Sequence, residues 1–112
     1  MKVARQAYER GQILQILSQN RGSEIPIEFV LLLRTLDTLG SAMSAQDLRN
    51  RLQYLADKGY VQLRRNRDLP GFRPDRMARG VDRPDDIVSV KLTARGTDLV
   101  EGTIPADPGV QF

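Results

Sequence analysis

Four polar side chains recur at the spacing i, i+3, i+4, i+7 near the middle of the chain: Gln46, Arg49, Asn50 and Gln53. This spacing places all four on one face of an α-helix. Amide and guanidinium groups can hydrogen-bond to base edges and to phosphates, so such a face is typical of a helix that binds nucleic acid. By itself, a polar helix face is more often an ordinary solvated surface, and the rest of the chain has to decide between the two interpretations.

A second group of side chains with suitable chemistry follows this stretch. Residues 64–83 contain seven arginines against three aspartates, a net charge of +4, whereas the whole chain carries +3. The planar guanidinium of arginine pairs well with phosphate oxygens and with guanine, which favours contact with nucleic acid over the alternative of a basic but merely solvated loop. The candidate side chains in this segment are Arg64, Arg65, Arg67, Arg73, Arg76 and Arg79.

The composition argues against catalysis and against a bound metal. The chain contains no cysteine and no histidine. This excludes disulfides, thiolate nucleophiles, the usual zinc ligands and every mechanism that needs a histidine base. The sequence also lacks a Walker-type phosphate loop and the G-x-G-x-x-G pattern of dinucleotide-binding proteins. We therefore expect a protein that is not an enzyme and has no cofactor.

The length and hydropathy pattern indicate one domain without a membrane span. A chain of 112 residues suffices for one hydrophobic core but not for two. The longest apolar run, Phe29–Leu33, ends at Arg34 and is far shorter than the roughly 20 residues that cross a bilayer. No hydrophobic segment follows Lys2 and Arg5, as it would in a secretory signal. We expect a cytoplasmic location.

The helix that would carry the polar face has clear signals at both ends. Ser44 is a good N-cap, and Asp47 stands three residues later, where its carboxylate can complete a capping box. Lys58 followed by Gly59 is typical of a helix C-terminus. The apolar stripe between these signals consists of Leu48, Leu52 and Leu55. The sequence therefore predicts a helix over residues 44–58.

Two further helices are expected before it, over residues 2–20 and 26–39. The second has Pro26 in its first turn, and its apolar surface is wider than one stripe. Either this helix is the centre of the core or its spare leucines pack against a second copy of the chain. The candidate dimer contacts are Phe29, Leu32, Leu33 and Leu36. The short turn 40–44 then gives helix-turn-helix spacing between this helix and the next.

After Gly59 the apolar pattern changes to the alternation of β-strands. Residues 60–65 and 87–92 both alternate, and we expect them to pair as an antiparallel ribbon. The side chains expected to share one face of the second strand are Val88, Val90 and Leu92, with Ile87, Ser89 and Lys91 on the other. The connecting residues 66–86 form a long basic loop, and a loop of this length is usually functional or disordered. Its arginines favour a function.

The chain ends in a short helix and a tail. Thr93 is a good N-cap for a helix over residues 94–101, and Gly102 is a good stop. Residues 103–112 would be an extended tail whose last apolar side chains either dock on a neighbouring surface or stay loose. The predicted domain therefore covers residues 1–102.

This order of elements predicts a mostly helical α+β fold of the winged helix-turn-helix type, with three N-terminal helices, a two-stranded antiparallel wing and a short C-terminal helix. Leu55–Leu63 resembles the junction in which a recognition helix runs into the first wing strand. Lys91–Gly96 is similar to the L-T-x-x-G step that leaves the second wing strand in regulators of the MarR and ArsR type. Arg10–Leu17, Leu92–Gly102 and Pro108–Val110 together resemble a small ArsR-like winged-helix family of Mu-like phages and prophages, although the wing here is longer and richer in arginine.

The resemblance implies a transcriptional regulator that binds double-stranded DNA. The third helix would enter the major groove, a phosphate would lie at its N-terminus, and the wing arginines would follow the backbone or the minor groove. The residues expected to contact DNA are Ser44, Gln46, Arg49, Asn50, Gln53, Arg64, Arg65, Arg67, Arg73, Arg76 and Arg79. Because one chain covers little DNA, specific binding would need a homodimer that reads two half-sites.

The alternative is a protein-interaction or phage assembly module. Many winged helices serve in assembly, and the leucine-rich helix 26–39 would then be the active surface. No effector ligand can be inferred, since the metal-sensing relatives of the ArsR type bind metal through cysteine or histidine.

Overall fold

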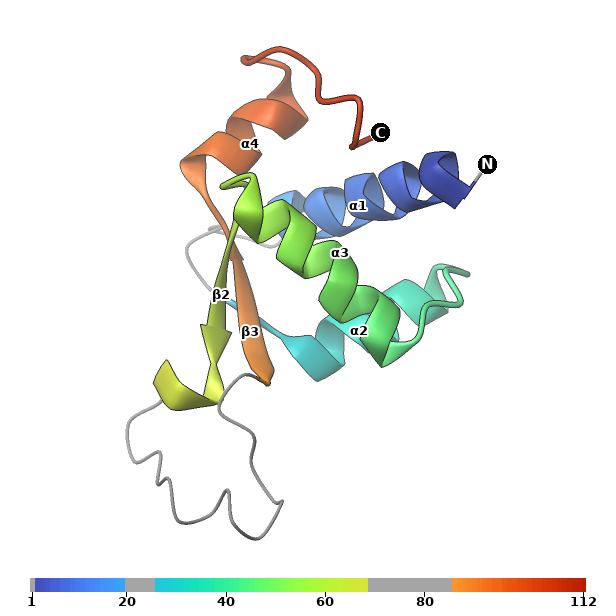
Figure 1. Ribbon diagram of the computed structural model, residues 1–112, viewed down its shortest axis with the longest axis vertical. Coiled ribbons are helices and arrows are strands. Elements are labelled where there is room, and N and C mark those ends of the chain that lie inside the picture. The colour runs from blue at the N-terminus through green and yellow to red at the C-terminus, as the bar shows by residue number, and fades with distance from the viewer. Residues whose placement is uncertain (1, 20–25, 69–85) are drawn as a thin grey trace, which may run out of the picture.

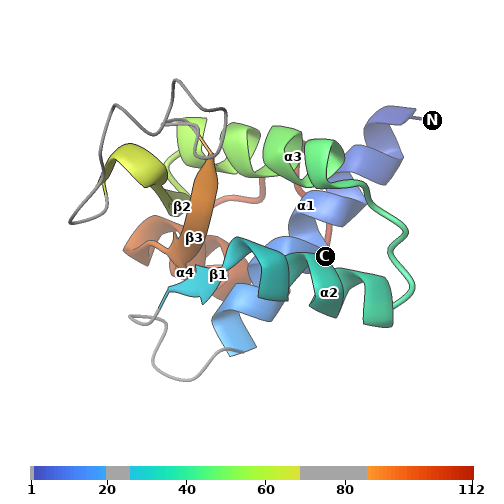
Figure 2. The same ribbon diagram turned by 90° about the horizontal axis from the view of Figure 1, so that it is seen from below.

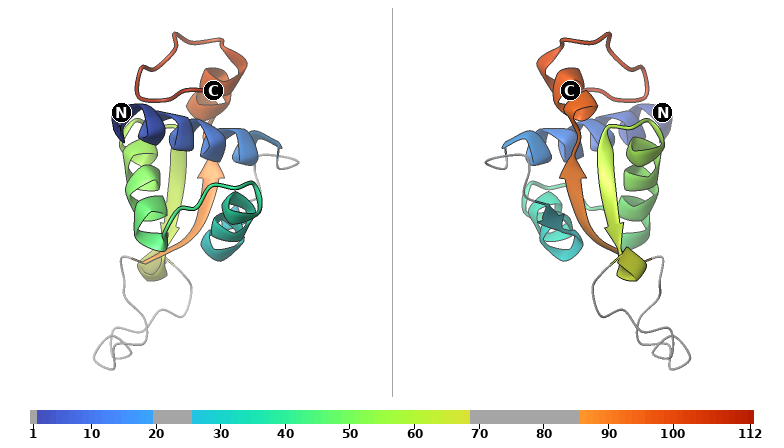
Figure 3. Two further views of the ribbon diagram at one scale, coloured as in Figure 1. Left: turned by 90° about the vertical axis from the view of Figure 1, so that its right-hand side faces the viewer. Right: turned by 90° about the vertical axis from the view of Figure 1, so that its left-hand side faces the viewer.

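The computed structural model describes residues 2–19, 26–68 and 86–112 and has an α+β architecture that is mostly helical, as predicted (Figure 1). Its elements in chain order are α1 (Lys2–Gln19), β1 (Ile27–Glu28), α2 (Phe29–Thr38), α3 (Ala45–Asp57), β2 (Val61–Arg65), the 3-10 helix η1 (Asn66–Asp68), β3 (Ile87–Leu92) and α4 (Ala94–Glu101). Helices α1, α2 and α3 lie on one side of an antiparallel sheet, and no described helix covers its other face (Figure 3).

One hydrophobic core joins the helices to the sheet. Its fully buried side chains are Ile13, Leu14, Leu32, Leu36, Leu48, Leu52, Leu55 and Val90. They come from α1, α2, α3 and β3, so each of these elements contributes its apolar side to the same interior. None of the helices in the described ranges has both the length and the apolar character needed to cross a lipid bilayer.

Helix α3 begins and ends where the sequence predicts. The Ser44 hydroxyl accepts a hydrogen bond from the Asp47 backbone N–H at 3.1 Å, and the Asp47 carboxylate accepts one from the Ser44 N–H at 3.3 Å. This is the predicted capping box. At the other end Gly59 has φ +81°, a left-handed conformation that favours glycine.

The sheet has three strands, so the expected two-stranded wing is wrong in this respect. Ile27 and Glu28 form β1, which pairs with β3 opposite Val90 and Ser89 and gives the strand order β1-β3-β2 (Figure 2). The predicted helix over residues 26–39 accordingly starts only at Phe29. A strand of two residues is too short to show an alternating pattern, and only pairing with a strand distant in sequence defines it.

The predicted alternation along β3 is also wrong at its first residues. Arg64 lies opposite Ser89, but Arg65 lies opposite Ile87, so β3 contains one extra residue at Val88. Such a bulge reverses the side on which the preceding residue points. Ile87 is therefore buried, while Val88 is only partly buried. The two residues have exchanged the environments that strict alternation would give them.

The turn after α3 is bonded to the start of α4. Thr93 donates from its hydroxyl to the Gly59 carbonyl at 2.6 Å and from its backbone N–H to the Tyr60 carbonyl at 3.1 Å. The Arg95 guanidinium donates to the Lys58 carbonyl at 3.1 Å. A Cβ on Gly96 would overlap the Tyr60 carbonyl oxygen. The two motifs on which the resemblance rests, Leu55–Leu63 and Lys91–Gly96, are thus in direct contact.

The C-terminal tail returns across α1. The Gln111 N–H donates to the Ala7 carbonyl at 2.9 Å, and a Cβ on Gly11 would overlap the Gln111 carbonyl oxygen. Val110 is buried, whereas Phe112 is exposed. The tail is therefore docked through Val110. Gly11, which is unfavourable in the middle of a helix, allows the close approach of the tail to α1.

A carboxylate and a phenol hold the tail to the end of α3. The Tyr60 hydroxyl donates to the Asp107 carboxylate at 2.7 Å, and the same carboxylate accepts from the Gly109 N–H. Burial works to raise the pKa of Asp107, but these two hydrogen bonds and the charges of Lys58 and Arg10 outweigh it and hold the pKa below its usual value. Burial and the hydrogen bond to Asp107 raise the pKa of Tyr60.

These shifts predict that the tail is held less tightly on acidification. Because the pKa of Asp107 is lowered in the folded state, its contribution is complete above the ordinary carboxyl pKa of about 4 and is lost as the pH falls through the lowered value. The raised pKa of Tyr60 gives the opposite pH dependence: its contribution to stability is complete at lower pH and is lost only above about pH 10. The loss of the Asp107 contribution should appear as faster amide hydrogen exchange at Gln111 when the pH is lowered from neutral to acidic. Asp107→Asn has no carboxylate to titrate, so an unchanged acid midpoint in that variant would contradict this assignment.

Candidate nucleic-acid interface

The four predicted side chains of α3 lie on the side away from the core. Gln46, Asn50 and Gln53 are exposed and Arg49 is partly buried, while the leucines of the opposite stripe are fully buried. The Gln46 amide donates to the Asn50 side-chain oxygen at 3.1 Å, and the Arg49 guanidinium donates to the Gln46 oxygen at 3.3 Å. The structure thus brings three of the four together in one network. Each keeps further donors or acceptors that can face a ligand.

The Arg49 guanidinium lies over the ring of Phe29. Its guanidinium carbon lies 5.7 Å from the centroid of Phe29, within the range of a cation–π interaction. Phe29 itself is buried at the start of α2. The contact between α2 and α3 therefore limits the conformations of Arg49, which would reduce the entropy lost if Arg49 bound a ligand.

Gln53 connects α3 to strand β2. Arg65 of β2 donates from its guanidinium to the Gln53 side-chain oxygen at 2.6 Å, and the Gln53 amide donates to Asp57 at 2.9 Å. The polar surface therefore continues from α3 onto β2. Asp57 was not predicted from the sequence, although its position four residues after Gln53 on the same helix face is a usable signal.

Two of the predicted DNA-contacting arginines, Arg64 and Arg65, lie on opposite faces of the sheet. Arg65 points to the α3 side, whereas Arg64 is exposed on the open face of the sheet. Arg67 is exposed in η1, and the Asp68 carboxylate accepts from the Arg65 backbone N–H at 3.0 Å. Three further predicted contacts, Arg73, Arg76 and Arg79, lie outside the described residues. Arg65 is therefore joined to the face of α3 by its hydrogen bond to Gln53.

The outward face of α3 carries little net charge. Asp47 stands near its N-terminus and Asp57 at its C-terminus, and they offset the charges of Arg49 and Arg65. Such a face suits hydrogen-bond recognition better than general attraction of phosphate. The positive charge that phosphate binding requires lies mainly in residues 64–83.

No protein-family model, curated protein or solved structure matches this chain.

The expected dimer contacts on α2 are placed mainly inside the core. Phe29, Leu32 and Leu36 are buried, and Leu33 is partly buried. They pack towards β3 and the other helices, so they leave little surface for a second copy of the chain. The exposed apolar side chains of this region are instead Val30, Leu31 and Leu39.

Sequence reasoning also missed an ion pair between α1 and α3. The Arg51 guanidinium lies 3.6 Å from the Glu9 carboxylate, and the two side chains are only 12% and 8% exposed. Arg5 approaches the same carboxylate at 3.9 Å. Arg51 is thus turned towards the interior although Arg49, two residues earlier, belongs to the polar face. The helical period separates the two arginines, but nothing in the sequence identifies Glu9 as the partner.

Proposed function

We propose that this chain is a winged helix-turn-helix protein that binds double-stranded DNA and acts as a transcriptional regulator of the phage or prophage type. The observation that carries the proposal is the continuous polar surface from α3 through the Gln53–Arg65 hydrogen bond to the base of the arginine-rich segment. A helix face rich in amides and guanidinium groups, adjoining a strongly basic loop, provides both base recognition and phosphate attraction.

The architecture supports this function. Three helices precede the antiparallel pair β2–β3, and the arginine-rich segment 64–83 begins with Arg64 and Arg65 of β2. Strand β1 pairs with β3 on the side away from β2, so it leaves the β2 edge next to α3 unchanged. In the proposed complex α3 enters the major groove, and the arginines of the wing contact the backbone or the minor groove. A homodimer would supply a second half-site.

One observation favours a second candidate, a protein-interaction module. Val30, Leu31 and Leu39 of the α2 region are 57%, 56% and 59% exposed. Large exposed apolar side chains can mark a protein contact. In that case the partner would bind α2, and the polar face of α3 would be an ordinary solvated surface.

Fluorescence anisotropy with a labelled random-sequence duplex tests the proposal. If four to six arginine–phosphate contacts form, the affinity should fall by roughly 10²- to 10³-fold between about 50 mM and about 200 mM salt, because each contact releases condensed counterions. The double variant Val30→Ser with Leu31→Ser should bind duplex like the native chain. A native chain with no duplex affinity at low salt would exclude DNA binding and favour the protein-interaction module.

A further inference from the structure

The open face of the sheet carries a second set of polar side chains, distinct from the face of α3. Cross-strand pairs point to the same side of a sheet, and the register pairs Gln62 with Lys91 and Arg64 with Ser89. These four side chains therefore share the face that no described helix covers (Figure 3). Arg65 points to the opposite side, where it bonds to α3.

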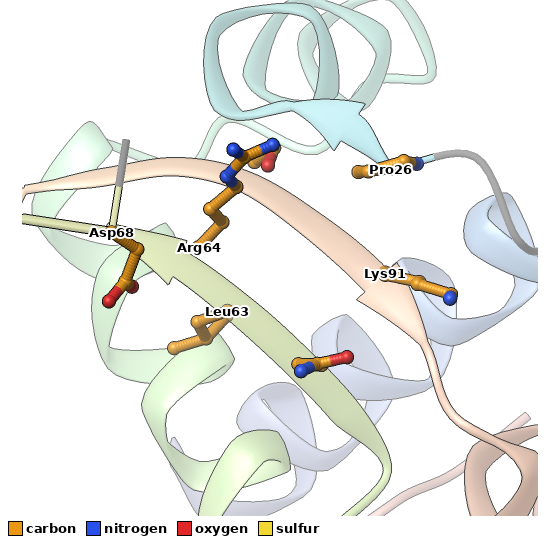
Figure 4. Close-up of a pocket in the computed structure, with 7 residues that line it drawn as sticks. Pro26, Leu63, Arg64, Asp68 and Lys91 are labelled. Carbon is orange, nitrogen blue, oxygen red and sulfur yellow. The ribbon is translucent and has the colours of Figure 1, made fainter. Parts of the chain in front are cut away.

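A hollow of about 380 Å³ lies over these side chains. Figure 4 shows Arg64 crossing β3 towards β1 and Lys91 projecting from β3 farther along the same face. Pro26, just before β1, adds apolar lining, and Leu63 borders the hollow although it is paired with Val90 and packs against the core. The volume lies within the range of sites that bind small molecules, and a mixture of apolar lining with a few polar groups is typical of them.

The two cations of the hollow have no ion-pair partner in the described part of the chain. The ion pairs there involve Arg5 and Arg51, not Arg64 or Lys91. Asp68 also lines the hollow, but its carboxylate accepts the Arg65 backbone N–H. Two cations against one carboxylate give the lining a charge of +1, which one anionic group would neutralise. Glu28, which is paired with Ser89, is a further acid on this face.

We propose that this hollow binds a small organic anion. Its carboxylate or phosphate group would be held by Arg64 and Lys91, with Gln62 and Ser89 as additional hydrogen-bonding groups, and its apolar part would lie against Pro26. A duplex along α3 would meet Arg65, whereas the hollow opens on the other side of the same strand. The geometry therefore favours a small ligand over DNA at this place, and the site does not depend on the proposed function.

Backbone amide shifts of ¹⁵N-labelled protein, titrated with phenyl phosphate, benzoate and inorganic phosphate, test the site. We expect saturable shifts confined to the strands around Arg64 and Lys91, with a Kd of about 1 mM or tighter for the best probe. Inorganic phosphate should bind more weakly than phenyl phosphate, because it lacks an apolar part. Preference for benzoate would identify the ligand class as carboxylates, and preference for phenyl phosphate would identify it as phosphate esters.

Charge variants make the test specific. Arg64→Gln and Lys91→Gln should each weaken binding about tenfold, the loss expected for one charge-assisted hydrogen bond. Glu28→Gln should strengthen binding, because it removes a negative charge from the same face. Arg34→Gln removes an exposed cation on α2 and should leave binding unchanged.

Three results would overturn the proposal: shifts that do not saturate, equal losses in the Arg34→Gln and Arg64→Gln variants, or a short duplex that shifts the same amides at lower concentration than phenyl phosphate. The last result would assign the hollow to the DNA interface. Anisotropy with duplex DNA tests the proposed function, and the amide-shift titration tests the anion site. The two proposals can therefore fail independently.

Discussion

Alanine at Gly96 is expected to lower the free energy of unfolding by about 3 kcal/mol, although the residue lies in the first turn of a helix. In an open helix position the same substitution would stabilise by up to about 1 kcal/mol. Here the added Cβ would overlap the Tyr60 carbonyl oxygen and approach Leu92. Relief of that overlap would separate α4 from the turn after α3 and weaken the hydrogen bonds that Thr93 donates to this turn.

Thermal or urea unfolding followed by circular dichroism measures this effect. A loss of 3 kcal/mol in a domain of this size corresponds to a Tm lower by roughly 12–24 °C. Gly102→Ala is the matched control, because Gly102 has φ +79° but no atom within 4 Å of the added Cβ. It should cost only the backbone strain, about 1–2 kcal/mol. A higher Tm for Gly96→Ala than for the native chain would contradict the packing of α4 against this turn.

The elements that local sequence signals define were predictable. The capping box at Ser44, the cap at Thr93 and the glycine stops at Gly59 and Gly102 depend on residues within one helical turn, and the structure has each of them. The contact between Gly59 and Thr93 was not predictable, because it joins two segments more than thirty residues apart that share no periodic pattern. Single-sequence patterns report local preferences, whereas such contacts depend on how the elements pack.

The same distinction applies to the candidate site. The helical period correctly placed Gln46, Arg49, Asn50 and Gln53 on the outward face. It could not show that the Phe29 ring lies under Arg49, because Phe29 belongs to another helix. Strand alternation could separate Arg64 from Arg65, but a count of basic residues treats both as one charged segment. The assignment of each arginine to a face therefore required the strand register.

Substitution of Arg49 should reduce discrimination between DNA sequences more than it reduces general affinity. Arg49 and Asn50 lie together on the outward face and can each make a two-point contact with a base edge, which is worth about 1–3 kcal/mol of discrimination. Arg49→Ala or Asn50→Ala should therefore bind a preferred site about 5- to 150-fold more weakly while binding random duplex almost normally. Selection from a random duplex pool would first supply the preferred site, and anisotropy would then compare the variants.

The Arg49→Lys variant distinguishes the effect of the planar guanidinium from the effect of the positive charge at this position. Lysine keeps the positive charge but lacks the planar fork that contacts guanine and stacks over Phe29, so this variant should retain the salt dependence and lose discrimination. The double variant Arg73→Ala with Arg76→Ala should do the opposite. Its affinity for all duplexes should fall alike, and the slope of log affinity against log salt concentration should decrease by the amount expected for about two phosphate contacts. Because the acids Asp47 and Asp57 of α3 offset the charge of Arg49, the helix contributes little net positive charge, and the two variants change different parts of the binding free energy. Equal effects of both substitutions on random and preferred duplexes would show that α3 does not read the base sequence.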